Sequence, residues 1–246
     1  MRAKDKKERK EKILYLIVRS FIKTCSPISS EFLSENFDLS CSPATVRNDM
    51  AELEEEGFLY QPHTSAGRIP TQKAYRYFVN FFLEKKGLLE EERNKIMQIL
   101  NSTYNLDTLL NKTSHILADI THQIGLVSLL WEPEKVYTHG VKYIAQEPEF
   151  KDLQKLEIIL ELLEDEDFIW NLLAKYEDEE EKILIGSELG IPELDCVSLI
   201  FSSYGGENLP SGKLAILGPL RMDYEKVLGS IEFISKVLND ILVRFV

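Results

Sequence analysis

The chain has 246 residues, of which 44% are hydrophobic and 28% are charged, and this composition is typical of a globular protein with one or two domains. No stretch approaches 18 consecutive apolar residues, so we expect no membrane span. No signal-peptide core follows the basic N-terminus, so we expect a cytoplasmic protein. The three cysteines, Cys25, Cys41 and Cys196, are scattered, which argues against a disulfide framework and against a zinc site.

The net charge of −12 argues at first against a nucleic-acid partner, but the charge is unevenly distributed. Residues 1–86 hold 15 Lys and Arg against 12 Asp and Glu, whereas residues 87–246 hold 14 against 29. Such an asymmetry is typical of a DNA-binding module joined to an acidic partner domain. Taken alone, a charge run more often marks a solvated face.

Three helices and a hairpin are predicted in the first part. Apolar residues at three- and four-residue spacing predict a helix over residues 6–24, and Ser29 or Ser30 caps a short helix that ends near Asn36. Ser42 and Pro43 suit the cap and first position of a third helix, which Gly57 ends. A strand over 58–61, a loop over 63–68, a return strand over 69–71 and a helix over 72–85 complete a winged helix-turn-helix layout.

The second part is predicted as an α+β domain over residues 87–246, after a linker at Lys85, Lys86 and Gly87. Helical patterns cover 88–123, 150–163, 168–176 and 223–245, and residues 136–145 are predicted to be extended. The expected strands are 124–131, 183–186, 196–202 and 213–218. The intervening 206–213 lacks the Walker spacing and is interpreted as a turn.

The third helix has the face that DNA recognition requires. At about 100° per residue, Val46, Met50 and Leu53 lie together and point inward. The outward residues near its start are small or polar, which permits close approach and base or phosphate contacts: Ser42, Ala44, Thr45, Arg47 and Asn48. Acidic residues follow at Glu52 and at 54–56, so we expect the helix to dock by its N-terminus. Alone, this pattern more often marks an ordinary amphipathic helix with a polar outer face.

The loop that follows favours the DNA-binding interpretation. It offers His63, Thr64 and Ser65, a flexible Gly67, and Arg68, which we expect at the tip of a wing in a minor groove or on a phosphate.

These residues resemble a known family. The run from Ser42 to Glu54, Gly57, and the run from Gln61 to Thr71 are similar to the HrcA heat-inducible transcription repressors, and so is the segment from Gly218 to Tyr224. The resemblance implies a repressor of chaperone genes, and not an enzyme. It implies that a homodimer binds an inverted repeat of double-stranded DNA, the element called CIRCE, and that the chaperonin GroEL maintains the active form.

The resemblance also implies a GAF-like second domain with an inserted dimerising domain. Here Ser128 is followed almost directly by His139, so the inserted domain is expected to be reduced or absent. We still expect a homodimer, because two-fold half-sites require paired recognition helices.

No catalytic, metal or cofactor site is predicted. His115 and His122 are seven residues apart without a third ligand, and no catalytic triad stands out. Two rival functions remain open: a regulator whose GAF-like domain binds a small-molecule effector, and a protein-interaction or chaperone-client module that does not bind DNA.

Overall fold

A computed structural model describes residues 3–130, 135–206 and 208–245. The chain divides into two compact units, Met1–Leu83 and Glu84–Val246. The second unit therefore begins three residues before the expected start at residue 87. Lys86 belongs to the second unit, because its N–H donates to Glu225 O at 3.1 Å and its ammonium pairs with the Glu225 carboxylate.

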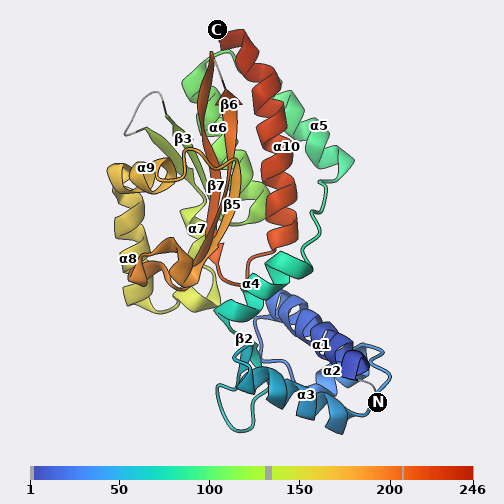
Figure 1. Ribbon diagram of the computed structural model, residues 1–246. Helices are drawn as coiled ribbons and strands as arrows, with labels where there is room; N and C mark the ends of the chain where they lie inside the picture. The colour runs from blue at the N-terminus through green and yellow to red at the C-terminus, as the bar shows by residue number, and fades with distance from the viewer. Residues whose placement is uncertain (1–2, 131–134, 207, 246) are drawn as a thin grey trace. The chain divides into compact units, whose positions relative to one another are not determined.

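The first unit follows the predicted element order (Figure 1). It contains α1 (Ala3–Thr24), α2 (Ser30–Asn36), α3 (Pro43–Glu55), β1 (Leu59–Tyr60), β2 (Ile69–Pro70) and α4 (Gln72–Phe81). Helix capping accounts for the starts, since Ser29, Ser42 and Thr71 accept hydrogen bonds from backbone N–H groups in the first turns of α2, α3 and α4. Gly57 ends α3 with a φ of 76°, the left-handed conformation that glycine adopts most readily.

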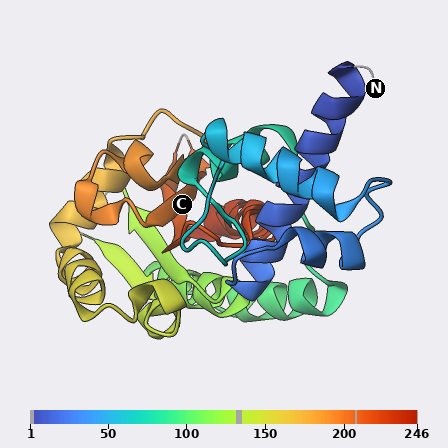
Figure 2. The ribbon, with the colours of Figure 1, turned by 90° about the horizontal axis from the view of Figure 1, so that it is seen from below.

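The core of this unit lies between α1, α3 and α4. Helix α3 packs across α1, as both views show (Figures 1 and 2). The predicted inward residues of α3 are buried, and the opposing helices contribute further buried side chains: Ile13, Leu14, Ile17 and Val18 from α1, Val46, Met50 and Leu53 from α3, and Ala74, Tyr75 and Phe78 from α4.

The second unit is built on a five-stranded antiparallel sheet in the order β4-β3-β7-β6-β5. The strands are β3 (Ile124–Leu129), β4 (Val136–His139), β5 (Glu181–Ile185), β6 (Val197–Gly206) and β7 (Leu209–Pro219). The helices are α5 (Glu90–Asn101), α6 (Leu106–Thr121), α7 (Val141–Ile144), α8 (Leu153–Glu164), α9 (Glu166–Ala174) and α10 (Tyr224–Leu242). Short 3₁₀ helices are also present at Pro148–Phe150, Gly186–Leu189, Pro192–Leu194 and Val243–Phe245.

Alternation along the strands gives the sheet two buried faces. Leu199 and Phe201 face α8 and α9, where they join one apolar cluster with Leu163 and Leu173. Ser198 points to the other face, where its hydroxyl lies 2.8 Å from Tyr224 Oη of α10. Figure 1 shows α10 and α6 on one side of the sheet and α8 and α9 on the other. The indole of Trp170 in α9 donates to Leu129 O at 3.3 Å and so ties α9 to the end of β3.

Several predicted bounds in this chain are wrong. Helix α4 ends at Phe81 rather than residue 85, and the region 88–123 is two helices, because Asn105 caps a new helix. Residues 136–145 are extended only to His139, after which Gly140, with a φ of 89°, starts α7.

The expected turn over 206–213 is mostly strand, because β6 and β7 form one long hairpin. Gly212 lies within β7, opposite Leu129 of β3, and not in the turn. Glycine is required there because a Cβ would overlap the Ser128 carbonyl of β3.

Candidate nucleic-acid interface

The start of α3 is exposed and held by its own cap. Ser42 Oγ accepts the Thr45 N–H at 3.2 Å and lies 3.0 Å from the Thr45 hydroxyl, so Thr45 is half-buried by this local contact. Ser42, Ala44, Arg47 and Asn48 are exposed. Thus four of the five residues predicted on the outer face of α3 are freely accessible from solvent.

Arg47 reaches from α3 to the first turn of α2. Its Nη2 donates to Glu31 Oε1 at 2.6 Å, although both side chains remain more than half exposed. The pKa of Glu31 is lowered, first by a hydrogen bond from its own backbone N–H, then by the Ser30 and Ser29 hydroxyls and by the charge of Arg47. Glu31 was not predicted to belong to this surface.

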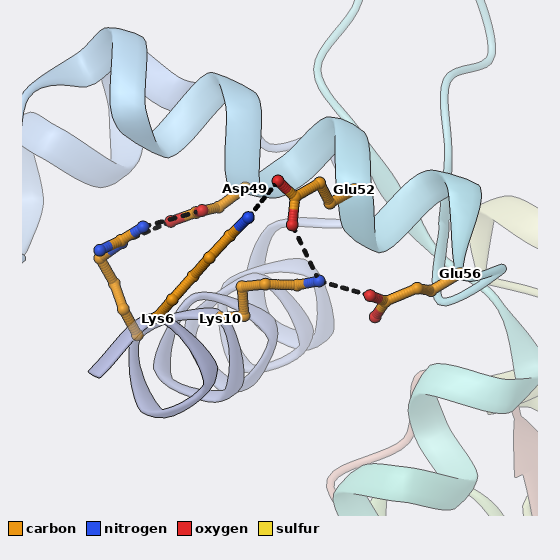
Figure 3. A network of polar contacts seen from close by, with 6 residues as sticks. Lys6, Lys10, Asp49, Glu52 and Glu56 are labelled. Atoms are coloured by element: carbon orange, nitrogen blue, oxygen red, sulfur yellow. Dashed lines mark hydrogen bonds and ion pairs between the residues drawn. The ribbon is translucent and has the colours of Figure 1, made fainter. Parts of the chain in front are cut away.

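Ion pairs with α1 engage Asp49 and Glu52 of α3 and Glu56 directly after it (Figure 3). Arg9 Nε donates to Asp49 Oδ2 at 2.5 Å, and its Nη2 donates to Oδ1 at 3.0 Å. Lys6 and Lys10 donate to the two oxygens of Glu52, and Lys10 also donates to Glu56. The pKa of Arg9 is raised, chiefly by its hydrogen bond to Asp49.

These pairs explain how acidic residues are accommodated in a helix whose N-terminal half is polar and exposed. The basic N-terminal segment neutralises Asp49, Glu52 and Glu56 within the protein, and it anchors α3 on α1. Some of the basic side chains that were predicted to favour DNA binding are therefore engaged in ion pairs within the protein.

The loop between β1 and β2, residues 61–68, is closed by side-chain hydrogen bonds. The Gln61 amide donates to Thr64 O at 3.0 Å and Ala66 O at 2.8 Å, and a turn joins Ala66 N–H to His63 O. His63, Thr64 and Ser65 are all exposed.

Gly67 was expected to make the loop flexible, but its role in the structure is to permit a close backbone contact. A Cβ at this position would overlap the backbone carbonyl group of Ile28, so glycine permits two chain segments to approach closely. Ile28 and Arg68 form an antiparallel bridge there, with N–O distances of 2.9 and 2.8 Å.

The prediction that Arg68 lies at the loop tip is wrong. The bridge to Ile28 places Arg68 at the base of the loop, and its side chain is only 14% exposed. Its Nε donates to Glu54 Oε2 at 2.8 Å. The exposed end of the loop is formed instead by His63, Thr64 and Ser65.

A hollow of about 360 Å³ brings several of the predicted residues together. Its lining includes Arg47 of α3, Thr64, Ser65 and Arg68 of the loop, and Glu31 of α2. Ala44, Asn48 and His63 lie outside this lining, and Asn48 and Ala44 remain exposed on α3. The hollow is thus polar and carries two arginines, each paired with a carboxylate.

The described residues contain no cluster of three or more His, Cys, Asp or Glu side chains able to hold a metal ion. His115 pairs with Asp119, whereas His122 lies against the Tyr143 ring. Within the same part of the chain, no helix combines the length and apolar character needed to cross a bilayer.

Comparison with known proteins identifies relatives over most of the sequence. Residues 128–228 match the family model described as the HrcA protein C-terminal domain. The chain is 29% identical over 341 aligned positions to the heat-inducible transcription repressor HrcA of Desulforudis audaxviator, with 96% of this chain and 98% of that protein covered. The protein of the same name from Beutenbergia cavernae is 47% identical over 120 residues, which cover 49% of this chain and 34% of that one.

A solved structure described as a hypothetical protein has the same fold. It matches with a TM-score of 0.75 at 20% sequence identity and covers 99% of this chain and 98% of its own. The alignment with the Desulforudis protein is longer than the 246 residues of this chain, so that protein carries residues without a counterpart here. Over nearly its whole length the chain is therefore similar to the HrcA heat-inducible transcription repressors, and it is shorter than they are.

Proposed function

We propose that this protein represses heat-shock genes by binding double-stranded DNA through its first unit, which acts as a winged helix-turn-helix. The observation that carries the proposal is the exposed N-terminal half of α3 beside the exposed hydroxyls of the β1–β2 loop. A polar helix start of this kind enters a major groove, while the loop forms a wing at the adjacent backbone. The relatives' name, heat-inducible transcription repressor, supplies the biological process.

In this proposal Asn48 and Arg47 contact base edges, and Ser42, Ala44 and Thr45 approach the groove wall. His63, Thr64 and Ser65 contact the phosphate backbone through the wing, and Arg68 supports the wing from its base through Glu54. The protein acts without catalysis.

The assembly proposed is a homodimer on an inverted repeat, because a two-fold operator requires two recognition helices. The second unit is then a GAF-like domain without the inserted dimerising domain. The direct antiparallel pairing of β3 with β4, in which Ser128 lies opposite Val136, supports the absence of an insertion between these strands. GroEL is the proposed partner that maintains the active form.

The experiment is a mobility-shift titration with the inverted repeat and with a scrambled duplex of the same composition. Asn48→Ala is expected to weaken operator binding by roughly 1–3 kcal/mol if Asn48 makes a bidentate base contact. Asn80→Ala, an exposed asparagine of α4, is the matched control and is expected to bind like the unaltered protein. Equal affinity of the unaltered protein for both duplexes contradicts the proposal.

A further inference from the structure

The ion pair between Glu31 and Arg47 places a carboxylate on the surface proposed to meet DNA. Arg47 is 67% exposed and Glu31 is 56% exposed, and the pair lies in the same hollow as Thr64 and Ser65. Because a carboxylate repels phosphate, it weakens every contact with the DNA backbone in its surroundings. An acidic residue on this surface therefore needs a function that offsets that repulsion.

The two oxygens of Glu31 have separate partners. Oε1 accepts from Arg47 Nη2 at 2.6 Å, and Oε2 lies 3.2 Å from the Ser30 hydroxyl, which donates to it. The residue occupies the second position of α2, just after the Ser29 cap, so backbone N–H groups favour its anionic form. The carboxylate is therefore held in place from its own helix before it contacts Arg47.

A guanidinium carries five N–H donors in a rigid planar fork. When one Nη is held by Glu31, the remaining donors keep a defined direction, and the net charge that a phosphate would sense is reduced. Hydrogen bonding to a guanine edge depends on the direction of the donors, whereas phosphate attraction depends chiefly on charge. The pair therefore favours base reading by Arg47 over unspecific backbone contact.

We propose that Glu31 is a specificity-determining residue that positions the Arg47 guanidinium for a guanine edge and disfavours its binding to phosphate. This inference rests on the proposed DNA-binding function. It assigns to α2 a residue that sets selectivity without itself touching a base.

The experiment compares operator and scrambled duplex affinities for Glu31→Gln in the full chain. The isosteric amide removes the charge, so binding to scrambled DNA is expected to strengthen, and the operator-to-scrambled affinity ratio is expected to fall roughly three- to tenfold, within the range of one base contact. Glu35→Gln removes an exposed carboxylate one turn along the same helix, and it is expected to leave the ratio unchanged.

A double-variant cycle tests whether the effect passes through Arg47. In the Arg47→Ala background, Glu31→Gln is expected to leave the ratio as it is. A ratio that falls equally in both backgrounds overturns the inference, and so does a Glu31→Gln protein that keeps the original ratio. If the unaltered protein itself does not distinguish the two duplexes, the proposed function fails, and the inference fails with it.

Arg47→Lys provides a second test that leaves Glu31 untouched. Lysine keeps the charge but lacks the planar fork, so binding to scrambled DNA is expected to persist while operator selectivity falls. Unchanged selectivity in this variant contradicts the assignment of a guanine edge to Arg47. Circular dichroism melting of each variant confirms that the comparison concerns folded proteins.

Discussion

Arg9 of α1 and Asp49 of α3 form a two-bonded ion pair whose Asp49 side chain is only 2% exposed and whose Arg9 side chain is 13% exposed. The pair joins the N-terminal helix to the helix proposed to read DNA. Since both side chains are largely removed from water, each offsets part of the cost of burying the other's charge.

Replacement of Asp49 by Ala is expected to destabilise the first unit by about 3 kcal/mol or more, because the largely buried Arg9 loses the carboxylate that accepts two of its hydrogen bonds. Hydrogen exchange of amides in α1 and α3 measures the effect. Lys4→Gln, which breaks an exposed pair with Glu8, serves as control and is expected to change stability very little. Equal protection in the two variants would show that the Arg9–Asp49 pair does not anchor α3.

Gly67→Ala is expected to displace the β1–β2 loop. The new Cβ overlaps the backbone of Ile28, which has no flexible group to move aside, so we expect a loss of roughly 1–3 kcal/mol and weaker DNA binding. Thermal melting and a mobility-shift titration measure the two effects. Gly206→Ala adds a Cβ in open space and is the control. A Gly67→Ala protein with unaltered melting contradicts the close approach to Ile28.

His139 is expected to make the second unit less stable as the solution is acidified. Its pKa is lowered from 6.5, chiefly by burial and further by the neighbouring His115, and its Nδ1 lies 2.7 Å from the Ser114 hydroxyl. The unfolded chain then binds more protons than the folded one below pH 6.5, so the free energy of unfolding falls as the pH drops through this window.

Urea unfolding at several pH values checks this prediction. His139→Gln is expected to flatten the decrease in stability below pH 6.5, because the replaced side chain no longer titrates. A pH profile of the same slope in both proteins assigns the acid sensitivity to other groups.

Lys213 of β7 is fully buried, and its ammonium donates to Glu177 O, Glu179 O and Ser203 Oγ at 2.6–3.1 Å. Lys213→Met is expected to cost roughly 2–4 kcal/mol, because the Glu177 and Glu179 carbonyls and the Ser203 hydroxyl lose their charged donor. Hydrogen exchange in β6 and β7 measures the loss. Lys182→Met, which removes a more exposed lysine paired with Glu179, is expected to change protection little. Equal effects would show that burial of Lys213 is not stabilising.

Local patterns predicted the first unit well. The caps at Ser29 and Ser42 and the inward face of Val46, Met50 and Leu53 depend on residues within one or two turns, so the sequence contains the whole signal. The family resemblance likewise rested on contiguous residues. Contacts between segments that are distant in the sequence leave no local pattern from which they could be predicted.

The missed features are long-range contacts. Asp49 is buried together with Arg9, which lies 40 residues earlier in the chain. No local pattern around Asp49 distinguishes it from a solvated carboxylate. Arg68 lies at the base of its loop because Ile28 pairs with it from a segment 40 residues earlier. Glu31 resembled an ordinary helix-start residue, although an acid in the first turn of α2 and an arginine in the first turns of α3 were visible in the sequence.

The contact of Trp170 with the end of β3 provides an intrinsic optical probe. The chain has two tryptophans, Trp131 and Trp170, and both belong to the second unit, so indole fluorescence reports on that unit and is silent about the first. A heating experiment that records indole emission and operator occupancy in one cuvette therefore tells which half of the protein responds first to a rise in temperature.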